Sequence, residues 1–182
     1  FGDLQARLAQ RGIRLLLLCG DARGVDWKRF ATGQVSMDRP WRLPELCLVH
    51  PLRPLQLLVQ QLASAVRLWH LGRCLPDPLQ RAICCNAARD CVSPTVLQQS
   101  LLFWVGRGAI RSWKPQAFLA LYEGRAWERC ALWGAKSGWS ACRTVGYQHT
   151  VVFRESLALI QPGLDRREAI PDIVLCLGRG PL

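Results

Sequence analysis

The sequence predicts an α/β fold in which helices cover both faces of a parallel β-sheet. Short apolar runs stop abruptly at a glycine or an ionisable residue, as the buried strands of parallel sheets do. Residues 117–148 read as strand, helix and strand, at the length of a crossover unit in a parallel sheet. Glu123 and His149 each follow an apolar run, at the edge of the sheet where α/β proteins bind ligands.

The first fifty residues contain one clear strand pattern. A short amphipathic helix over residues 4–10 leads into an apolar run over 13–19, which ends at Gly20-Asp21. Such a run is typical of a strand that is buried on both faces. Residues 20–54 carry Gly, Pro and Asp at short intervals, so we expect a loop there, with one short element near residues 46–49.

The middle of the chain is predicted to be helical. From residue 55, apolar residues recur at the spacing of one helix face, and Pro76 and Pro78 close this region. Ser93-Pro94 is an N-cap followed by proline at the first helical position. It predicts a helix over 95–105 that ends near Gly106 and Gly108. Tryptophans at helical spacing are expected to pack in the core, namely Trp69, Trp104, Trp127 and Trp133.

The last third contains the strand, helix and strand unit and one further strand. Trp113-Lys-Pro115 turns the chain into a strand over 117–122, and a helix follows over 125–136. Strands are then predicted over 143–148 and over 173–177. Strands alternating with helices indicate a parallel α/β architecture.

The chain has 182 residues and a net charge of +11, carried almost wholly by dispersed arginines. A basic surface favours anionic partners, such as nucleotide phosphates, an acidic membrane surface or nucleic acid. The alternative is that arginine is simply abundant in the proteins of the source organism. Nucleic acid is not expected as a partner, because no single element combines clustered basic and aromatic residues.

Cysteine usage points to a reducing compartment. The nine cysteines form no Cys-x-x-Cys pair and are scattered within apolar segments, so free thiols and a cytoplasmic protein are expected. No apolar run reaches the roughly 18–20 residues that span a bilayer. No metal-ligand cluster, Walker loop, dinucleotide glycine pattern or hydrolase elbow is present, so neither a metal nor a bound cofactor is predicted.

Glu123 and His149 are the candidate catalytic residues. A carboxylate at the start of a helix is favoured by the free amides there, so Glu123 binds a substrate hydroxyl, orients a basic group or merely caps the helix. His149 lies between Gln148 and Thr150 and could act as a general base or donate to a phosphate. Glu128 is expected to face solvent, or to pair with Arg125 or Arg129.

Three segments resemble the bacterial surface carbohydrate biosynthesis proteins, which look like glycosyltransferases of the two-Rossmann-domain (GT-B) type. They are Leu121-Tyr-Glu-Gly-Arg-Ala-Trp-Glu-Arg129, Gly146-Tyr-Gln-His-Thr150 and Pro171-Asp-Ile-Val-Leu-Cys-Leu-Gly178. The second segment is also similar to one in related polymerases of wall and capsule polymers. Those polymerases have glycine at the position of Thr150. The resemblance covers roughly residues 117–178, and Asp26-Trp27 fits it loosely.

The resemblance implies a Rossmann-like, acceptor-side domain over 1–170 and the start of a second, truncated domain over 171–182. The chain would then be an amino-terminal fragment, inactive alone, that lacks most of the nucleotide-sugar site. His149 and Glu123 would be catalytic. Substrate contacts are expected from the remaining residues of the matched segments, namely Tyr122, Trp127, Glu128, Gln148 and Thr150.

Two functions from different classes remain open. The first is transfer of a sugar from a nucleotide-sugar donor to a glycan or lipid-linked acceptor in the bacterial cytoplasm, at the periphery of the inner membrane. The net positive charge of the chain would suit docking on an anionic membrane leaflet. The second is a non-catalytic α/β module that binds a nucleotide or an anionic glycan. A module of this kind would not need Glu123 and His149 to face one cleft.

Overall fold

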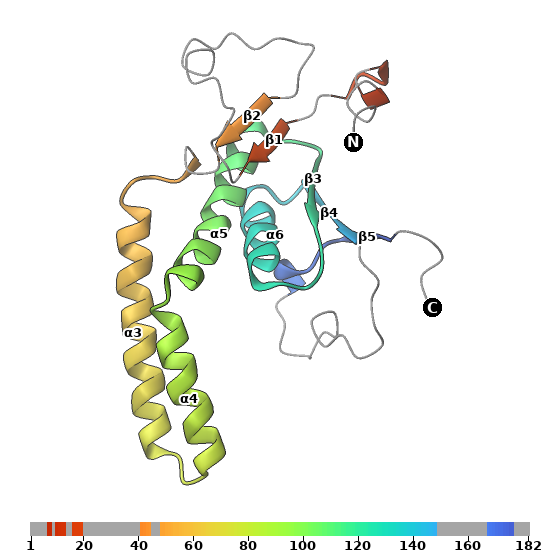
Figure 1. Ribbon diagram of the computed structural model, residues 1–182. Coiled ribbons are helices and arrows are strands. Elements are labelled where there is room, and N and C mark those ends of the chain that lie inside the picture. Colours follow the sequence, from red (N-terminus) through yellow and green to blue (C-terminus); the bar gives the residue numbers. More distant parts are fainter. Residues whose placement is uncertain are drawn as a thin grey trace. The chain divides into compact units, whose positions relative to one another are not determined.

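The computed structural model describes residues 7–8, 10–13, 16–19, 41–44, 48–148 and 167–176. The chain divides into two compact units, Phe1–Leu48 and Val49–Leu182. Figure 1 traces the elements of both. The start of a second domain predicted at residue 171 stays a prediction.

The first unit contains a two-stranded parallel sheet. Strand β1 (Leu16–Cys19) pairs with β2 (Trp41–Pro44), with Leu16 opposite Trp41. The strand predicted over 13–19 is therefore confirmed over four residues. The loop predicted over 20–54 is wrong at β2, where a proline ends the strand. Proline is tolerated at the end of a strand because its missing N–H interrupts few ladder hydrogen bonds.

The second unit is built on a three-stranded parallel sheet with the order β3-β4-β5. Its strands are β3 (Ala117–Leu121), β4 (Arg143–Gln148) and β5 (Ile173–Cys176). The register places Phe118 opposite Thr144, and Val145 opposite Ile173. The predicted strands agree with these bounds to within one residue, and the predicted parallel α/β sheet is confirmed.

Helix α6 (Ala126–Gly138) connects β3 to β4 and packs against both. The short 3-10 helix η2 (Arg167–Ala169), which precedes β5, also packs against α6. On the other face, Leu119 of β3 is 59% exposed and Leu175 of β5 is 49% exposed. Helices were predicted on both faces of the sheet. The prediction is confirmed for the face that α6 covers, and for the other face it stays a prediction.

Helix α5 (Pro94–Trp113) packs closely against α6. It runs through Gly106 and Gly108, so its predicted end near residue 105 is wrong. A Cβ at Gly106 would lie 3.1 Å from the backbone nitrogen of Ala135, and one at Gly134 would lie 2.7 Å from the carbonyl carbon of Phe103. The glycines therefore allow the two helix backbones to approach, rather than ending a helix.

The best-buried part of this unit lies where α5, α6 and the sheet meet. Ile110, Leu132 and Ala135 have no exposed surface. Cys142 joins this cluster, and Phe118 and Trp139 pack against it. Burial of large apolar groups supplies most of the stabilisation of such a core.

Helices α3 (Arg53–Cys74) and α4 (Pro78–Cys91) form a hairpin that is closed by Leu75, Pro76 and Asp77. Asp77 caps α4 by accepting a hydrogen bond from the Leu79 amide at 3.0 Å. Small residues line the contact, since a Cβ at Gly72 would lie 3.1 Å from the Cβ of Cys84. The sequence pattern did not indicate α4, because its inward positions are mostly alanine and cysteine.

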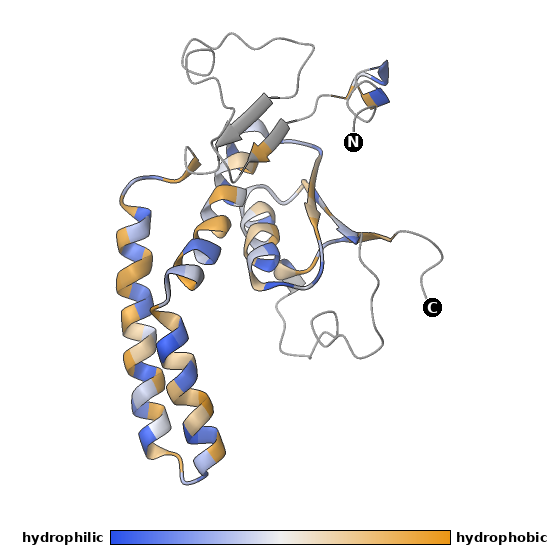
Figure 2. Ribbon diagram, viewed as in Figure 1, coloured by the Kyte–Doolittle hydropathy of each residue, from blue (hydrophilic) through white to orange (hydrophobic). Residues whose placement is uncertain are grey.

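The apolar face predicted from residue 55 onward exists, but it does not face the core. We name it the α3 stripe, and its members are all at least 38% exposed, namely Leu55, Leu58, Val59, Leu62, Val66 and Trp69. Figure 2 shows hydrophobic residues along this helix. The expectation that Trp69 packs in the core is wrong, because 48% of its surface is exposed. Within the described part of the chain, no helix combines the length and hydrophobicity required to cross a bilayer.

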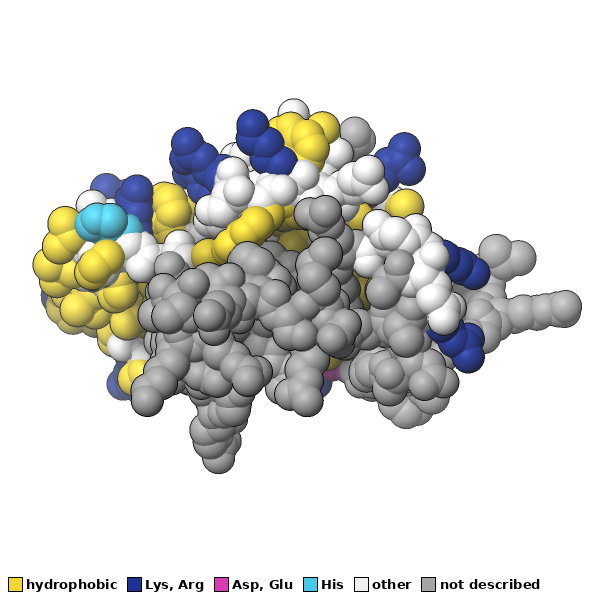
Figure 3. Space-filling view, turned by 90° about the horizontal axis from the view of Figure 1, so that it is seen from above, with side chains coloured by type: hydrophobic (Ala, Val, Ile, Leu, Met, Phe, Trp, Pro, Cys, Tyr) yellow, Lys and Arg dark blue, Asp and Glu magenta, His cyan; other side chains and the backbone are white. Residues whose placement is uncertain are grey.

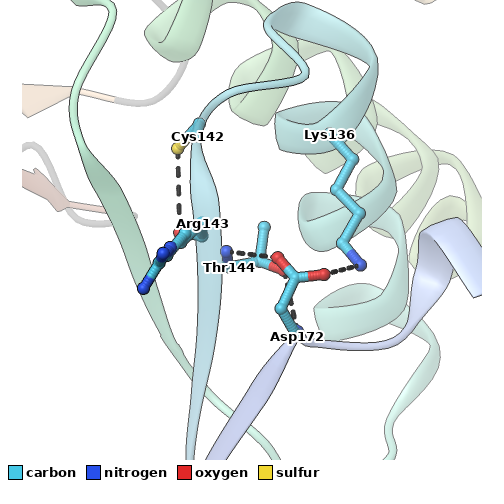
Figure 4. A network of polar contacts seen from close by, with 5 residues as sticks. All are labelled: Lys136, Cys142, Arg143, Thr144 and Asp172. Carbon is cyan, nitrogen blue, oxygen red and sulfur yellow. Dashed lines mark hydrogen bonds and ion pairs between the residues drawn. The ribbon is translucent and has the colours of Figure 1, made fainter.

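A polar network joins α6, β4 and β5 at the amino end of the sheet (Figure 4). The Asp172 carboxylate accepts from Lys136 Nζ at 2.6 Å, from the Thr144 amide at 2.8 Å and from Thr144 Oγ1 at 2.9 Å. Partial burial opposes ionisation of Asp172, but the hydrogen bonds from Lys136 and Thr144 outweigh it and lower the pKa of this carboxyl. The network therefore favours the ionised carboxylate.

Replacing Asp172 with alanine is expected to lower the free energy of unfolding by about 1–2 kcal/mol at pH 7, the cost of lost hydrogen bonds to a charged group. Because the pKa of Asp172 is lower in the folded state, its contribution is present above the unfolded value of about 3.9. It is lost as the pH falls through the folded pKa. Urea unfolding between pH 7 and pH 2.5 should show that the difference in unfolding free energy between the wild type and the variant becomes smaller as the pH falls. The exposed Asp90→Ala is the control, and a difference that is constant across this range would contradict the prediction.

Candidate functional site at the carboxyl edge of the sheet

The carboxyl ends of β3, β4 and β5 meet at one edge of the sheet. Leu121 lies opposite Tyr147, and Gln148 lies opposite Cys176. The Tyr122 amide donates to the Tyr147 carbonyl at 3.0 Å, which extends the pairing by one residue. The last residues of these strands therefore lie side by side, as the sequence predicted for a parallel sheet.

Tyr122 is packed into the sheet. Only 4% of its surface is exposed, and a Cβ at Gly146 would lie 2.7 Å from the Tyr122 Cβ. The glycine of β4 thus makes room for the tyrosine. The burial of Tyr122 suits a residue that supports the edge of the sheet. The substrate contact that the resemblance implies for Tyr122 stays a prediction.

Glu123 and Arg125 form an ion pair at the start of α6. Arg125 Nη2 lies 2.7 Å from Glu123 Oε2, and the side chains of Arg125 and Glu123 are 64% and 17% exposed, respectively. The carboxylate is therefore largely covered, while the guanidinium reaches solvent. The sequence singled out Glu123 but not its partner, although an arginine two residues after a carboxylate in a tight loop is a signal that could have found it.

Glu128, rather than Glu123, caps α6. Its Oε2 accepts from the Glu123 amide at 2.7 Å and from the Arg125 amide at 3.0 Å. Its exposure is 1%, so the expectation that Glu128 faces solvent is wrong. A carboxylate in the first turn satisfies amides that have no partner within the helix, and this demand draws the side chain inward.

Burial raises the pKa of Glu128, and the negative charge of Glu123 adds to this effect, while the backbone hydrogen bonds oppose it. The second oxygen, Oε1, is buried and has no hydrogen-bond partner within the described part of the chain. The amides of Glu123 and Arg125, in the turn that precedes α6, are thus already occupied by the protein's own carboxylate. An anionic ligand at this edge would have to use other donors.

Gln148 supplies such a donor at the end of β4. The residue is 8% exposed, and its Oε1 accepts from the Cys176 thiol at 3.4 Å. Its Nε2 is buried and lacks a hydrogen-bond partner among the described residues. Buried polar atoms are nearly always paired in folded proteins, so this amide nitrogen is a candidate donor to a ligand at the carboxyl edge.

The remaining predicted site residues are only partly placed. Trp127 lies in the first turn of α6 and is half-buried. His149 and Thr150 lie outside the residues that the structure describes, as do Asp26 and Trp27. The structure thus brings Tyr122, Glu123, Glu128 and Gln148 to the same edge of the sheet.

No protein-family model, no curated protein and no solved structure matches this chain. Among the described residues, no three His, Cys, Asp or Glu side chains are grouped so that they could hold a metal ion. The seven cysteines from Cys74 to Cys176 are free thiols. What the chain does must therefore be inferred from its own residues.

Proposed function

We propose that this chain is a glycosyltransferase-like protein of bacterial surface polysaccharide biosynthesis, and that it binds its substrates at the carboxyl edge of the β3-β4-β5 sheet. The observation that carries the proposal is that a carboxylate and a buried amide group stand at the carboxyl ends of two neighbouring strands. Glu123 follows β3, and Gln148 ends β4 with an unpartnered Nε2 among the residues described. His149 is the next residue in the sequence.

The chemistry assigns a role to each group. His149 would take the proton from an acceptor hydroxyl as its oxygen attacks the anomeric carbon. The bond from that carbon to the donor's phosphate oxygen would break, and the nucleoside diphosphate would leave with the electron pair. Glu123 would accept a hydrogen bond from an acceptor hydroxyl, and Gln148 Nε2 would donate to the sugar or a phosphate. Arg125, whose guanidinium is exposed, is suited to contact the diphosphate.

The proposal extends to the parent architecture. The sheet described here would belong to the acceptor-side domain of a GT-B-type enzyme, and a second domain would hold most of the nucleotide-sugar site. The partners would be a nucleotide sugar and a glycan or lipid-linked acceptor, with no metal or further cofactor. We place the protein in the bacterial cytoplasm, at the periphery of the inner membrane.

A non-catalytic binding module is the second candidate, and one observation favours it. Glu123 is already paired with Arg125 at 2.7 Å, so its carboxylate could serve mainly to hold the loop before α6. Nucleic acid is not proposed as a partner. The Lys and Arg side chains on the face shown in Figure 3 lie apart from one another and form no continuous basic surface among the described residues.

The predicted outcome of mutagenesis distinguishes the two candidates. We expect His149→Ala and Glu123→Ala to lower sugar transfer by the full-length parent about 100-fold or more, the usual contribution of an acid–base group. Polymer production reports the transfer in cells, and the thermal midpoints of the variants should match that of the wild type. Normal polymer from both variants would contradict catalysis by these residues.

Binding measurements on the full-length parent complete the test. Calorimetric titration of the parent with UDP, GDP and CDP and their sugars should find one binder, whose affinity falls in Gln148→Ala. Glu168→Ala serves as the matched control, because Glu168 is an exposed residue of η2, away from the carboxyl edge. Nucleotide binding by the parent without transfer would favour the module. Absence of binding to all nucleotides by the parent would contradict sugar transfer, and of the second candidate it would leave only a module that binds an anionic glycan.

A further inference from the structure

The α3 stripe is an exposed apolar surface, which the described helices and strands leave uncovered. Leu55, Val59 and Val66 are 60%, 59% and 57% exposed, and Trp69 and Leu62 are each 48% exposed. Residues at spacings of three, four and seven lie on one side of a helix. From residue 55 to residue 69, this row is about 21 Å long at 1.5 Å per residue. Figure 3 looks down on α3 from its amino end and shows hydrophobic side chains gathered there.

The helix buries a different side. Beyond the half-buried Arg53 and Pro54 at its start, the covered or half-covered positions of α3 are Leu57, Gln61, Ala65, Leu68 and Gly72, and Gly72 packs on Cys84 and Cys85 of α4. Gln61 Nε2 donates to Ser100 Oγ of α5 at 3.4 Å. The inward side of α3 thus mixes two leucines with small and polar residues, while the six apolar residues of the stripe face outward. A contiguous exposed apolar patch of this kind marks an interaction surface.

Charge selects the kind of partner. Helix α3 contains Arg53, Arg67 and Arg73 and has no aspartate or glutamate. Arg73 lies over the Trp69 ring at 4.9 Å, next to the stripe. A second copy of α3 would bring arginines towards arginines without an acidic residue on either helix to pair with them. An anionic surface would instead attract the exposed Arg67 and Arg73, whereas Arg53 lies over the Trp104 ring of α5 at 3.9 Å.

We propose that the α3 stripe docks on the surface of an anionic lipid bilayer, with α3 lying in the plane of the interface. The leucines, valines and Trp69 would enter the boundary between headgroups and acyl chains, where tryptophan is favoured. Arg73, which lies over Trp69 of the stripe, would keep its guanidinium group at the anionic headgroups while its aliphatic stem covers apolar surface. This inference concerns α3 alone and does not depend on chemistry at the carboxyl edge of the sheet.

Vesicle binding tests the proposal. The full chain is expected to co-sediment with vesicles of phosphatidylcholine and phosphatidylglycerol at about 3:1, and about tenfold less with phosphatidylcholine alone or at high salt, where surface charge is screened. The double variant Leu62→Gln, Val66→Gln should lower binding to the anionic vesicles at least tenfold. Both residues are exposed, so the variant should keep its circular dichroism spectrum and its thermal midpoint.

A matched control separates the stripe from general hydrophobicity. Leu79→Gln removes a leucine that is 67% exposed but lies on α4, and its vesicle binding should equal that of the wild type. Absence of wild-type binding to anionic vesicles, or equal binding by the double variant, would overturn the proposal. A wild-type dimer in light scattering that dissociates in the double variant, without vesicle binding, would assign the stripe to a second copy instead. A loss of binding in Leu79→Gln as large as in the double variant would also reject a specific stripe.

Discussion

Replacing Gly134 with alanine is expected to lower the free energy of unfolding of the Val49–Leu182 unit by about 3 kcal/mol, at the upper end of the usual cost of overpacking. The added methyl group would meet backbone atoms of α5, since it would lie 2.7 Å from the Phe103 carbonyl carbon and 2.9 Å from its Cα. A backbone cannot rotate aside as a flexible side chain can. The two helices would have to separate, and the core that they share would loosen.

Helix propensity predicts the opposite sign, which makes the experiment decisive. Alanine in a helix interior is favoured over glycine by roughly 1 kcal/mol, so without the clash the variant would be more stable. Chemical denaturation of Gly134→Ala should be compared with Gly72→Ala, whose nearest contact is a side-chain atom at 3.1 Å. The free energy of unfolding should fall less in the Gly72 variant than in the Gly134 variant. An increase in stability for Gly134→Ala would show that α5 and α6 do not approach as described.

Replacing Glu128 with alanine is expected to cost about 2–3 kcal/mol of unfolding free energy. The variant would leave the amides of Glu123 and Arg125 without their acceptor at a buried position, and lost caps and unpaired buried donors each cost about 1–3 kcal/mol. Glu128→Gln keeps one oxygen acceptor and should lose less than the alanine variant. Urea unfolding at pH 7 measures both.

The pH dependence of Glu128 has the opposite sign to that of Asp172. Burial raises the pKa of Glu128 in the folded state, so the folded protein binds the proton more readily than the unfolded chain. Stability therefore falls as the pH rises from the unfolded value of about 4.3 through the folded pKa. A glutamine side chain does not titrate, so the advantage of the wild type over Glu128→Gln should shrink as the pH rises from about 4 to about 7. An advantage that grows over this range would contradict a raised pKa.

Strands were the elements that the sequence predicted best. The runs at 117–122, 143–148 and 173–177 are short, apolar and bounded by polar residues or glycine, and each coincides with a strand to within one residue. Strand β2 was missed because Pro40 and Pro44 flank Trp-Arg-Leu, a pattern that reads as a loop. The limits of a strand can be predicted from the sequence when polar residues or glycine flank its apolar run on both sides.

Helix orientation was harder to predict, because periodicity shows that a face exists without showing what it contacts. The large residues of α3 predicted a core-facing side, yet Gly72 and its small neighbours on α4 form the contact. A glycine in a helical pattern can either end the helix or allow a second helix to approach closely. Gly106 was interpreted as a helix end, but it is the place where α6 approaches α5. Only the position of the partner helix distinguishes these two cases.

At the candidate site, the sequence predicted which strands would present polar residues but not how those residues are paired. Glu123 and Gln148 lie at neighbouring strand ends, as the parallel register requires. The inward turn of Glu128 could not be foreseen from spacing alone, because a glutamate in the first turn of a helix can equally face solvent. Its burial follows from two backbone amides that only the folded loop brings together.

The order β3-β4-β5 also bears on how quickly this sheet can form. Each pairing of the central strand joins residues fewer than about thirty positions apart, since one crossover leads directly to the next strand. Loop closure therefore costs little entropy for a parallel sheet, and such topologies fold faster than those that depend on distant pairings. With α6 packed on β3 and β4, this strand, helix and strand segment has the local character of a folding nucleus on which the rest of the unit can condense.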